Sequence, residues 1–108
     1  MYAVRFTSTA EADLQEIMDY VSRVLDNPSA AESLLDQIDE RIRKLSDYPE
    51  AHPLATDIKL QEWGIRVFTF GNYVGLYRVR RDEQTVVVLR LLHGRRDWIS
   101  LLTGDRPT

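Results

Sequence analysis

Hydrophobic residues recur at helical spacing through the first half of the chain. Ser8 and Glu11 stand at capping-box spacing, which predicts the start of a helix after a short alternating run at residues 2–7. Asn27 and Pro28 predict the N-cap and first turn of a second helix. Each helix has one apolar face, so the two predict an antiparallel hairpin. The apolar positions are Leu14, Ile17, Met18, Val21 and Leu25, followed by Ala31, Leu34, Leu35, Ile38, Ile42 and Leu45.

The spacing changes from helical to alternating in the second half of the chain. Residues 65–70, 73–80 and 85–92 predict three strands, with a Gly71–Asn72 hairpin turn and a second turn at 81–84. These strands form an antiparallel meander, which the N-terminal alternating run is free to join. The sequence therefore predicts an α+β fold of order β-α-α-β-β-β, an antiparallel sheet packed on one face by an N-terminal helical hairpin.

The length of 108 residues predicts one domain, residues 1–108, in which about 103–108 form a flexible tail. The N-terminus reaches acidic residues early and contains no continuous apolar run. We therefore expect a cytoplasmic protein with no signal peptide and no membrane partner.

Several kinds of chemistry find no support in the sequence. The chain has no cysteine and only two histidines, His52 and His93, so we expect no metal site and no cofactor. No glycine-rich phosphate loop or common hydrolase motif is present. His52 is interpreted as an ordinary turn residue. The helix carboxylates are interpreted as solvated surface groups; these are Asp13, Glu16, Asp36, Asp39 and Glu40.

Charge is unevenly distributed along the chain, whose net charge is −3. Residues 1–57 contain 12 acidic and 5 basic residues, whereas residues 58–108 contain 5 acidic and 9 basic residues. This split indicates either that the helices simply carry surface acids or that two surfaces serve two different partners.

The remaining candidates are basic residues of the predicted sheet and of the segment after its last strand. Strict alternation places Arg78 and Arg80 on the face of Val74, and Arg90 on the face of Val88. An arginine-lined sheet suits phosphate groups or an acidic protein, although arginine also keeps an exposed face soluble, and both interpretations stay open. The set comprises Arg66, Arg78, Arg80, Arg90, Arg95 and Arg96, together with His93.

Three stretches, in this order, give the chain a family resemblance: FTSTAEADLQEI, GIRVFTFGNYVGLYRV and VLRLLHGRRDW. Together they resemble the RelE/ParE toxin superfamily of bacterial type II toxin–antitoxin modules, from Tyr2 to about Leu102. The resemblance implies a toxin neutralised by a cognate antitoxin whose C-terminal segment wraps the helices and the sheet. The antitoxin contacts we expect are a sheet edge and the hairpin residues Leu14, Met18, Val21, Leu34, Leu35 and Ile38.

The superfamily contains two activities: RelE-like members cut messenger RNA on the ribosome, and ParE-like members poison DNA gyrase. Nuclease members have an arginine after the aromatic residue of the central strand, where this chain has Val74. Their C-terminal tyrosine is also missing, and Trp98 follows HGRRD instead. Both departures favour a ParE-like inhibitor of DNA gyrase that is not an enzyme. Its expected target contacts are Arg66, His93, Arg95, Arg96 and Trp98.

Two alternatives stay open. In the first, the chain is a ribosome-dependent endoribonuclease that acts on messenger RNA. His93 would then be the general base, and Arg66 and Arg95 would hold the phosphate. In the second, it is a non-toxic relative that still binds the antitoxin.

Overall fold

The computed structural model describes residues 1–94. The expected contact residues Arg95, Arg96 and Trp98 and the expected tail lie outside these described residues. The helices and strands are β1 (Ala3–Phe6), α1 (Ser8–Asp19), α2 (Pro28–Asp47), α3 (Ile58–Glu62), β2 (Arg66–Phe70), β3 (Tyr73–Arg80) and β4 (Thr85–His93). A π-helical turn, η1 (Tyr20–Val24), extends α1, and a 3₁₀ turn, η2 (Arg81–Glu83), joins β3 to β4.

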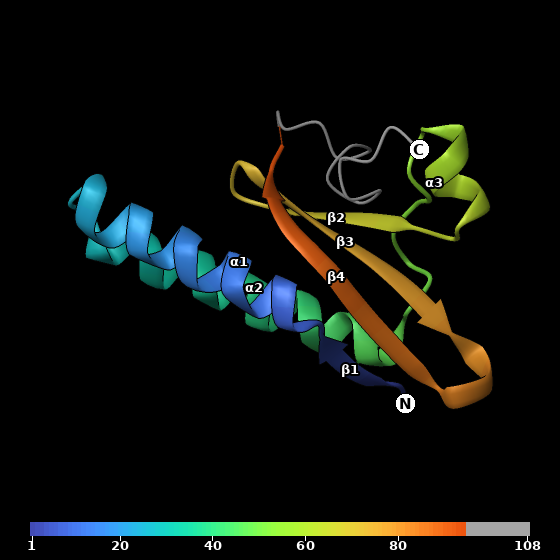
Figure 1. Cartoon of the computed structure of the whole chain (residues 1–108). Coiled ribbons are helices and arrows are strands. Elements are labelled where there is room, and N and C mark those ends of the chain that lie inside the picture. Colours follow the sequence, from blue (N-terminus) through green and yellow to red (C-terminus); the bar gives the residue numbers. More distant parts are fainter. Residues whose placement is uncertain (95–108) are drawn as a thin grey trace.

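The strands form one sheet in the order β1-β4-β3-β2, with the helical hairpin on one face (Figure 1). The predicted α+β class is confirmed, and the predicted elements occur in the predicted order with one further helix, α3, before β2. β2, β3 and β4 form the predicted antiparallel meander. β1 is different, because it pairs with β4 in parallel and makes the sheet mixed. Its direction depends on a partner more than 80 residues away in the sequence, which the local pattern does not specify.

Local capping residues set where the helices begin. Asn27 caps α2 as predicted, since its side-chain oxygen accepts the N–H of Ala30 at 3.2 Å. The predicted cap of α1 at Ser8 is wrong by one residue, because Thr7 is the N-cap and accepts the N–H of Ala10 at 3.0 Å. At the β2–β3 turn only Gly71 adopts positive φ, at +58°.

A β-bulge interrupts β4. Leu76 of β3 lies opposite Arg90, whereas its neighbour Tyr77 lies opposite Val88, so Leu89 has no partner across the strand pair. The extra residue breaks strict alternation, so Arg90 pairs with Leu76, yet its guanidinium reaches Asp13 of α1 on the hairpin side, where Val88 also packs. β1 ends at Phe6, opposite Val88 and just before the bulge. From Leu89 onward, this edge of β4 therefore has no neighbouring strand within residues 1–94.

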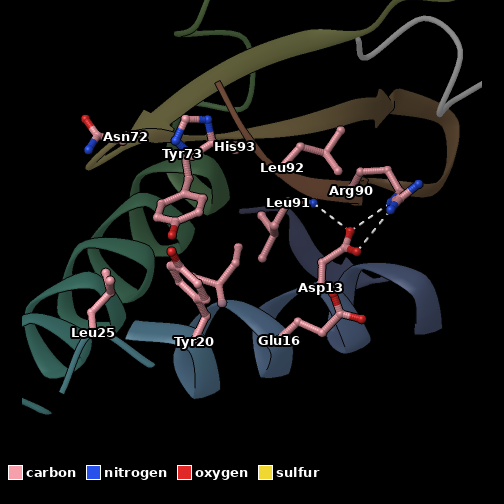
Figure 2. A pocket seen from close by; sticks show the side chains of 11 residues that line it. Asp13, Glu16, Tyr20, Leu25, Asn72, Tyr73, Arg90, Leu91, Leu92 and His93 are labelled. Atoms are coloured by element: carbon pink, nitrogen blue, oxygen red, sulfur yellow. Dashed lines mark hydrogen bonds and ion pairs between the residues drawn. The ribbon is translucent and has the colours of Figure 1, made fainter. Parts of the chain in front are cut away.

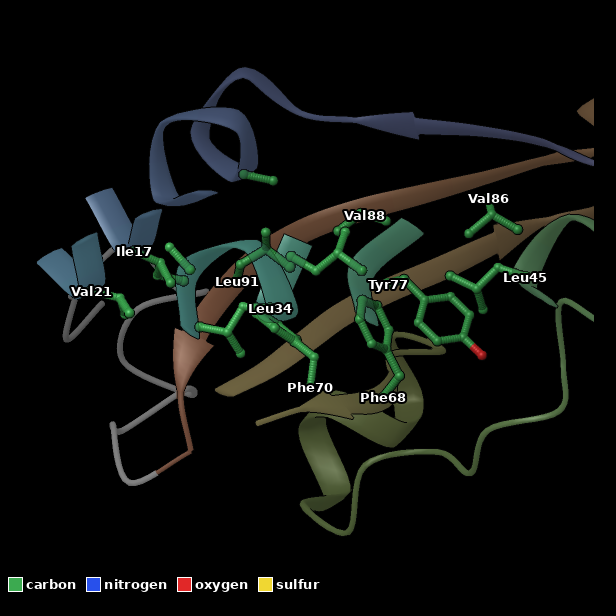
Figure 3. Packing of buried hydrophobic residues seen from close by; sticks show 13 residues of the cluster. Ile17, Val21, Leu34, Leu45, Phe68, Phe70, Tyr77, Val86, Val88 and Leu91 are labelled. Atoms are coloured by element: carbon green, nitrogen blue, oxygen red, sulfur yellow. The ribbon is translucent and has the colours of Figure 1, made fainter. Parts of the chain in front are cut away.

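Hydrophobic residues pack on both faces of the sheet. The larger core lies under the helical hairpin and contains Ile17, Val21, Leu34, Ile38, Leu45, Phe68, Phe70, Tyr77, Val86, Val88 and Leu91 (Figure 3). On the opposite face, α3 and its preceding loop cover a smaller cluster of Ala55, Leu60, Ile65, Val74, Leu76 and Leu92. The sequence pattern missed α3, because five residues are too few to show a helical period.

Phe68 and Gly75 fit together at the centre of the larger core. They lie opposite one another in β2 and β3. A Cβ atom at Gly75 would stand 2.2 Å from a ring carbon of Phe68, so the ring occupies the space where a side chain would be. Only glycine at this position allows the aromatic ring to lie flat on the neighbouring strand.

The loop between α2 and α3 is tied to the sheet. The Tyr77 hydroxyl donates to the Pro49 carbonyl at 2.8 Å, and the Arg66 guanidinium donates to the His52 carbonyl at 2.7 Å. The His52 ring lies 6.0 Å from Phe68 and 6.2 Å from Tyr77, between ring centres. His52 is thus more than a turn residue, because its ring packs against the core.

This packing predicts that acid weakens the fold. Burial, followed by the charges of Arg41 and Lys44, lowers the pKa of His52 from its ordinary value of 6.5. The unfolded chain then binds a proton more readily than the folded one, so stability falls as the pH drops below 6.5. We expect His52→Gln to reduce the loss of unfolding free energy between about pH 7.5 and 5.5, measured by urea denaturation. An equal loss in both proteins would contradict the prediction.

Candidate functional site

His93 lies at the end of the sheet, where the sequence placed the start of the candidate contact segment. It is exposed and stands opposite Tyr73, with the two rings edge-on at 5.5 Å between centres. Phe70 stacks on the other side of Tyr73, also at 5.5 Å. The Gly94 N–H donates to the Asn72 carbonyl at 2.9 Å. His93 thus lies on an aromatic platform formed by Tyr73 and Phe70.

A cavity of about 590 Å³ opens beside this platform (Figure 2). The side chains of Tyr20, at the start of η1, and Tyr73 reach into it, with their hydroxyl groups facing each other. Burial raises the pKa of Tyr73, and Tyr20 adds to the rise, so its phenol stays protonated at neutral pH. The lining residues are Asp13, Glu16, Ile17, Tyr20, Leu25, Asn72, Tyr73, Arg90, Leu91, Leu92 and His93.

Asp13 connects α1 to the bulged part of β4 (Figure 2). Its carboxylate accepts two hydrogen bonds from the Arg90 guanidinium, at 2.8 and 3.0 Å, and one from the Leu91 N–H at 3.0 Å. The side chains of Asp13 and Arg90 are only 12% and 20% exposed. The interpretation of Asp13 as a solvated surface group is therefore wrong, because its partner lies 77 residues away and leaves no local signal.

Arg66 does not join His93. It lies opposite Tyr77, four positions along β3 from Tyr73, which corresponds to about 13 Å along the strand. Its guanidinium donates to the carbonyls of Glu50 and His52. Arg66 therefore holds the loop at Glu50 and His52, away from the end of the sheet where His93 lies.

The helical hairpin has a groove on its outer side. Two cavities of about 600 and 530 Å³ share Glu11, Leu14 and Leu35, and so form one continuous surface. Met18 lines one end, and Val4 and Phe6 of β1 line the other. Of the six expected antitoxin contacts, Val21, Leu34 and Ile38 are buried in the core, whereas Leu35 is 41% exposed. Leu14, Met18 and Leu35 are thus the members that a partner can reach.

Val74 occupies the place that the resemblance assigns to the nuclease arginine. Its side chain is 6% exposed and packs in the smaller cluster with Leu76 and Leu92. Within residues 1–94, no three histidine or carboxylate side chains gather closely enough to hold a metal ion. No helix of this part of the chain has the length and apolar character needed to cross a membrane.

Comparison with known proteins decides the family. The model of the ParE toxin of the type II toxin–antitoxin system parDE matches residues 4–98. The chain belongs to the ParE toxin family. It is thus a toxin-type member of the RelE/ParE superfamily, as the three sequence stretches indicated.

Solved structures share this fold. The chromosomal ParDE system from Pseudomonas aeruginosa is 24% identical, with a TM-score of 0.68 over 86% of this chain and 96% of that chain. The RelBE2 toxin–antitoxin complex from Mycobacterium tuberculosis is 28% identical, with a TM-score of 0.61 over 85% and 90%. The isolated RelE toxin from Escherichia coli shares the fold at 14% identity, with a TM-score of 0.60 over 100% of both chains. No curated protein matches the chain significantly.

The Asp13–Arg90 contact predicts a large effect of one substitution. Asp13→Ala leaves a half-buried guanidinium without this carboxylate and the Leu91 N–H without its acceptor. We expect the free energy of unfolding, measured by urea denaturation, to fall by about 3 kcal/mol. Asp36→Ala on the exposed side of α2 is the control, and should change it by no more than about 0.5 kcal/mol. Equal effects of the two substitutions would show that Asp13 is an ordinary surface acid.

Proposed function

We propose that this ParE-family toxin arrests growth by binding DNA gyrase and that it catalyses no reaction. The observation that carries the proposal is the buried Val74. A nuclease needs a cation at this place to stabilise the extra negative charge of a phosphate under attack, and valine supplies none. The family match extends to residue 98 and so includes the proposed contact segment.

The proposed gyrase contacts are His93, Arg95, Arg96 and Trp98. Arginine and tryptophan are the residue types that contribute most to binding energy at protein interfaces. His93 is exposed at the end of β4, which is the position from which such a segment would reach a partner. Arg66 is not part of the proposal, because its guanidinium is bonded to loop carbonyls.

One observation favours a RelE-like endoribonuclease as a second candidate. The exposed imidazole of His93 lies edge-on to Tyr73, and a positioned imidazole is a suitable base for the 2′-hydroxyl of RNA. With Val74 in place and Arg66 bonded elsewhere, Arg95 would have to hold the phosphate. The scarcity of cations makes this function the weaker candidate.

We expect the purified toxin to block gyrase supercoiling and to leave translation in a cell extract unaffected. Trp98→Ala should weaken gyrase inhibition by about 30-fold, the effect of losing one central interface residue. Arg23→Gln, an exposed arginine paired with Asp19 on α1, is the control and should inhibit like the unaltered protein. The proposal is wrong if translation stops while gyrase stays active. Phased messenger RNA cuts that disappear with His93→Ala would then establish the nuclease, and the absence of both activities would indicate a non-toxic relative.

We further propose that the cognate antitoxin occupies the outer groove of the helical hairpin. The groove is apolar along Leu14, Met18 and Leu35, and Glu11 and Asp39 line its sides. An amphipathic helix with basic residues beside its apolar stripe fits this combination. The descriptions of the solved relatives as toxin–antitoxin complexes support a partner of this class.

The groove predicts a substitution that separates neutralisation from toxicity. Leu35→Glu adds a charge to an exposed side chain, so the toxin should still fold and arrest growth. Its Kd for the protein encoded beside its gene should rise at least about tenfold in titration calorimetry. Ile58→Glu, on an exposed position of α3, should leave that Kd unchanged. Unchanged binding by Leu35→Glu would place the antitoxin elsewhere.

A further inference from the structure

The sheet face opposite the helical hairpin has two different halves. α3 and its preceding loop cover the half that contains Leu76 and Leu92. Alternation along β3 places Arg78 and Arg80 on the same face as Leu76, but beyond this cover, and both are exposed. Arg5 of β1 is exposed as well. We call Arg5, Arg78 and Arg80 the arginine row.

The strand register brings the arginine row together. Arg5 in β1 and Arg78 in β3 both pair with Val87 of β4, one from each side. Paired residues point to the same face, so these two arginines stand about 10 Å apart at their Cα atoms. Arg80 pairs with Thr85, two positions further along the same strands. The row therefore lies on β1 and β3, on either side of β4, at the half of the sheet that no other element of residues 1–94 covers.

The charges of the row are largely uncompensated. Within residues 1–94, Arg5 and Arg78 have no carboxylate at ion-pair distance, whereas Arg80 contacts Glu83 at 3.2 Å. Arg5 also borders the groove cavity that Glu11 and Asp39 line, but neither carboxylate lies at ion-pair distance from it. β4 separates Arg5 from Arg78, so the two charges repel one another only weakly, and a ligand with more than one anionic group could contact both.

The chemistry of the surface favours nucleic acid over protein as the partner. Protein interfaces have an apolar centre, but here the centre is the single half-buried Val87. Protein–nucleic acid interfaces are polar and positively charged, and the planar guanidinium binds phosphate oxygens in pairs. We propose that the arginine row binds the phosphate backbone of a nucleic acid. This function does not depend on gyrase binding, and we expect it to be independent of base sequence, because contacts to phosphate oxygens carry no sequence information.

Binding of the full chain to a labelled DNA duplex and to a labelled single-stranded RNA, both of mixed sequence, is measured by fluorescence anisotropy. The binding constant is determined at salt concentrations between about 50 and 200 mM. Each phosphate contact contributes about 0.9 to the slope of log K against log salt for duplex DNA, and about 0.7 for a single strand. Arg5→Gln/Arg78→Gln should therefore lower the slope by about 1.4 to 1.8 and weaken binding. Arg23→Gln/Arg43→Gln removes the same charge from the exposed surface of the hairpin and should change neither quantity.

Each outcome decides the proposal. A loss of slope confined to the Arg5/Arg78 variant supports it, and the better of the two probes identifies DNA or RNA as the source of the phosphates. The proposal is overturned if the unaltered chain binds neither probe, if both double variants lose binding equally, or if only an acidic peptide such as polyglutamate binds the row. Arg95→Gln/Arg96→Gln tests the segment after β4 separately, so a failure there bears on the proposed function and not on the arginine row.

Discussion

The structure depends on how the start of α1 closes the edge of β4. β1 ends before the bulge, so the Leu89 carbonyl and the Leu91 N–H have no neighbouring strand. The Thr7 hydroxyl donates to that carbonyl at 2.9 Å, and the Asp13 carboxylate accepts the N–H. Because an unpaired polar group inside a protein costs free energy, the sheet and the helix stabilise each other at this point. Thr7 also caps α1, so one hydroxyl joins the local and the tertiary structure.

This attachment separates the surfaces of the molecule. α1 and α2 lie across one face of the sheet. The groove on their outer side is apolar along Leu14, Met18 and Leu35 and is also lined by Glu11 and Asp39. The opposite face divides into a part covered by α3 and an arginine-rich part. The uneven charge of the sequence thus corresponds to two surfaces of different character. The interpretation of two partners agrees better with this arrangement than that of a uniformly solvated protein does.

Much of the fold could be predicted because its determinants are local. Asn27 and Pro28 fix the start of α2, and Gly71 fixes the β2–β3 turn, each within a few residues of sequence. The missed features depend on distant partners. Asp13 resembles any helix acid until its distance to Arg90 is known, and the bulge at Leu89 leaves no trace in a run of valines and leucines. For the site, the position of His93 at the end of the last strand could be predicted. The distance between Arg66 and His93 along the sheet could not, because alternation shows which face a residue lies on and not how far along the strand it pairs.

The pairing of β1 with β4 also has a consequence for synthesis of the protein. β1 precedes the helical hairpin in the chain, and its strand partner within residues 1–94 is β4, which is made more than 70 residues later. Contacts of such long sequence separation form slowly and late. The hairpin can fold early, but β1, whose Val4 and Phe6 line the groove, is fixed only after β4 has emerged. Translation of the strand that leads to His93 therefore also completes the surface that we assign to the antitoxin.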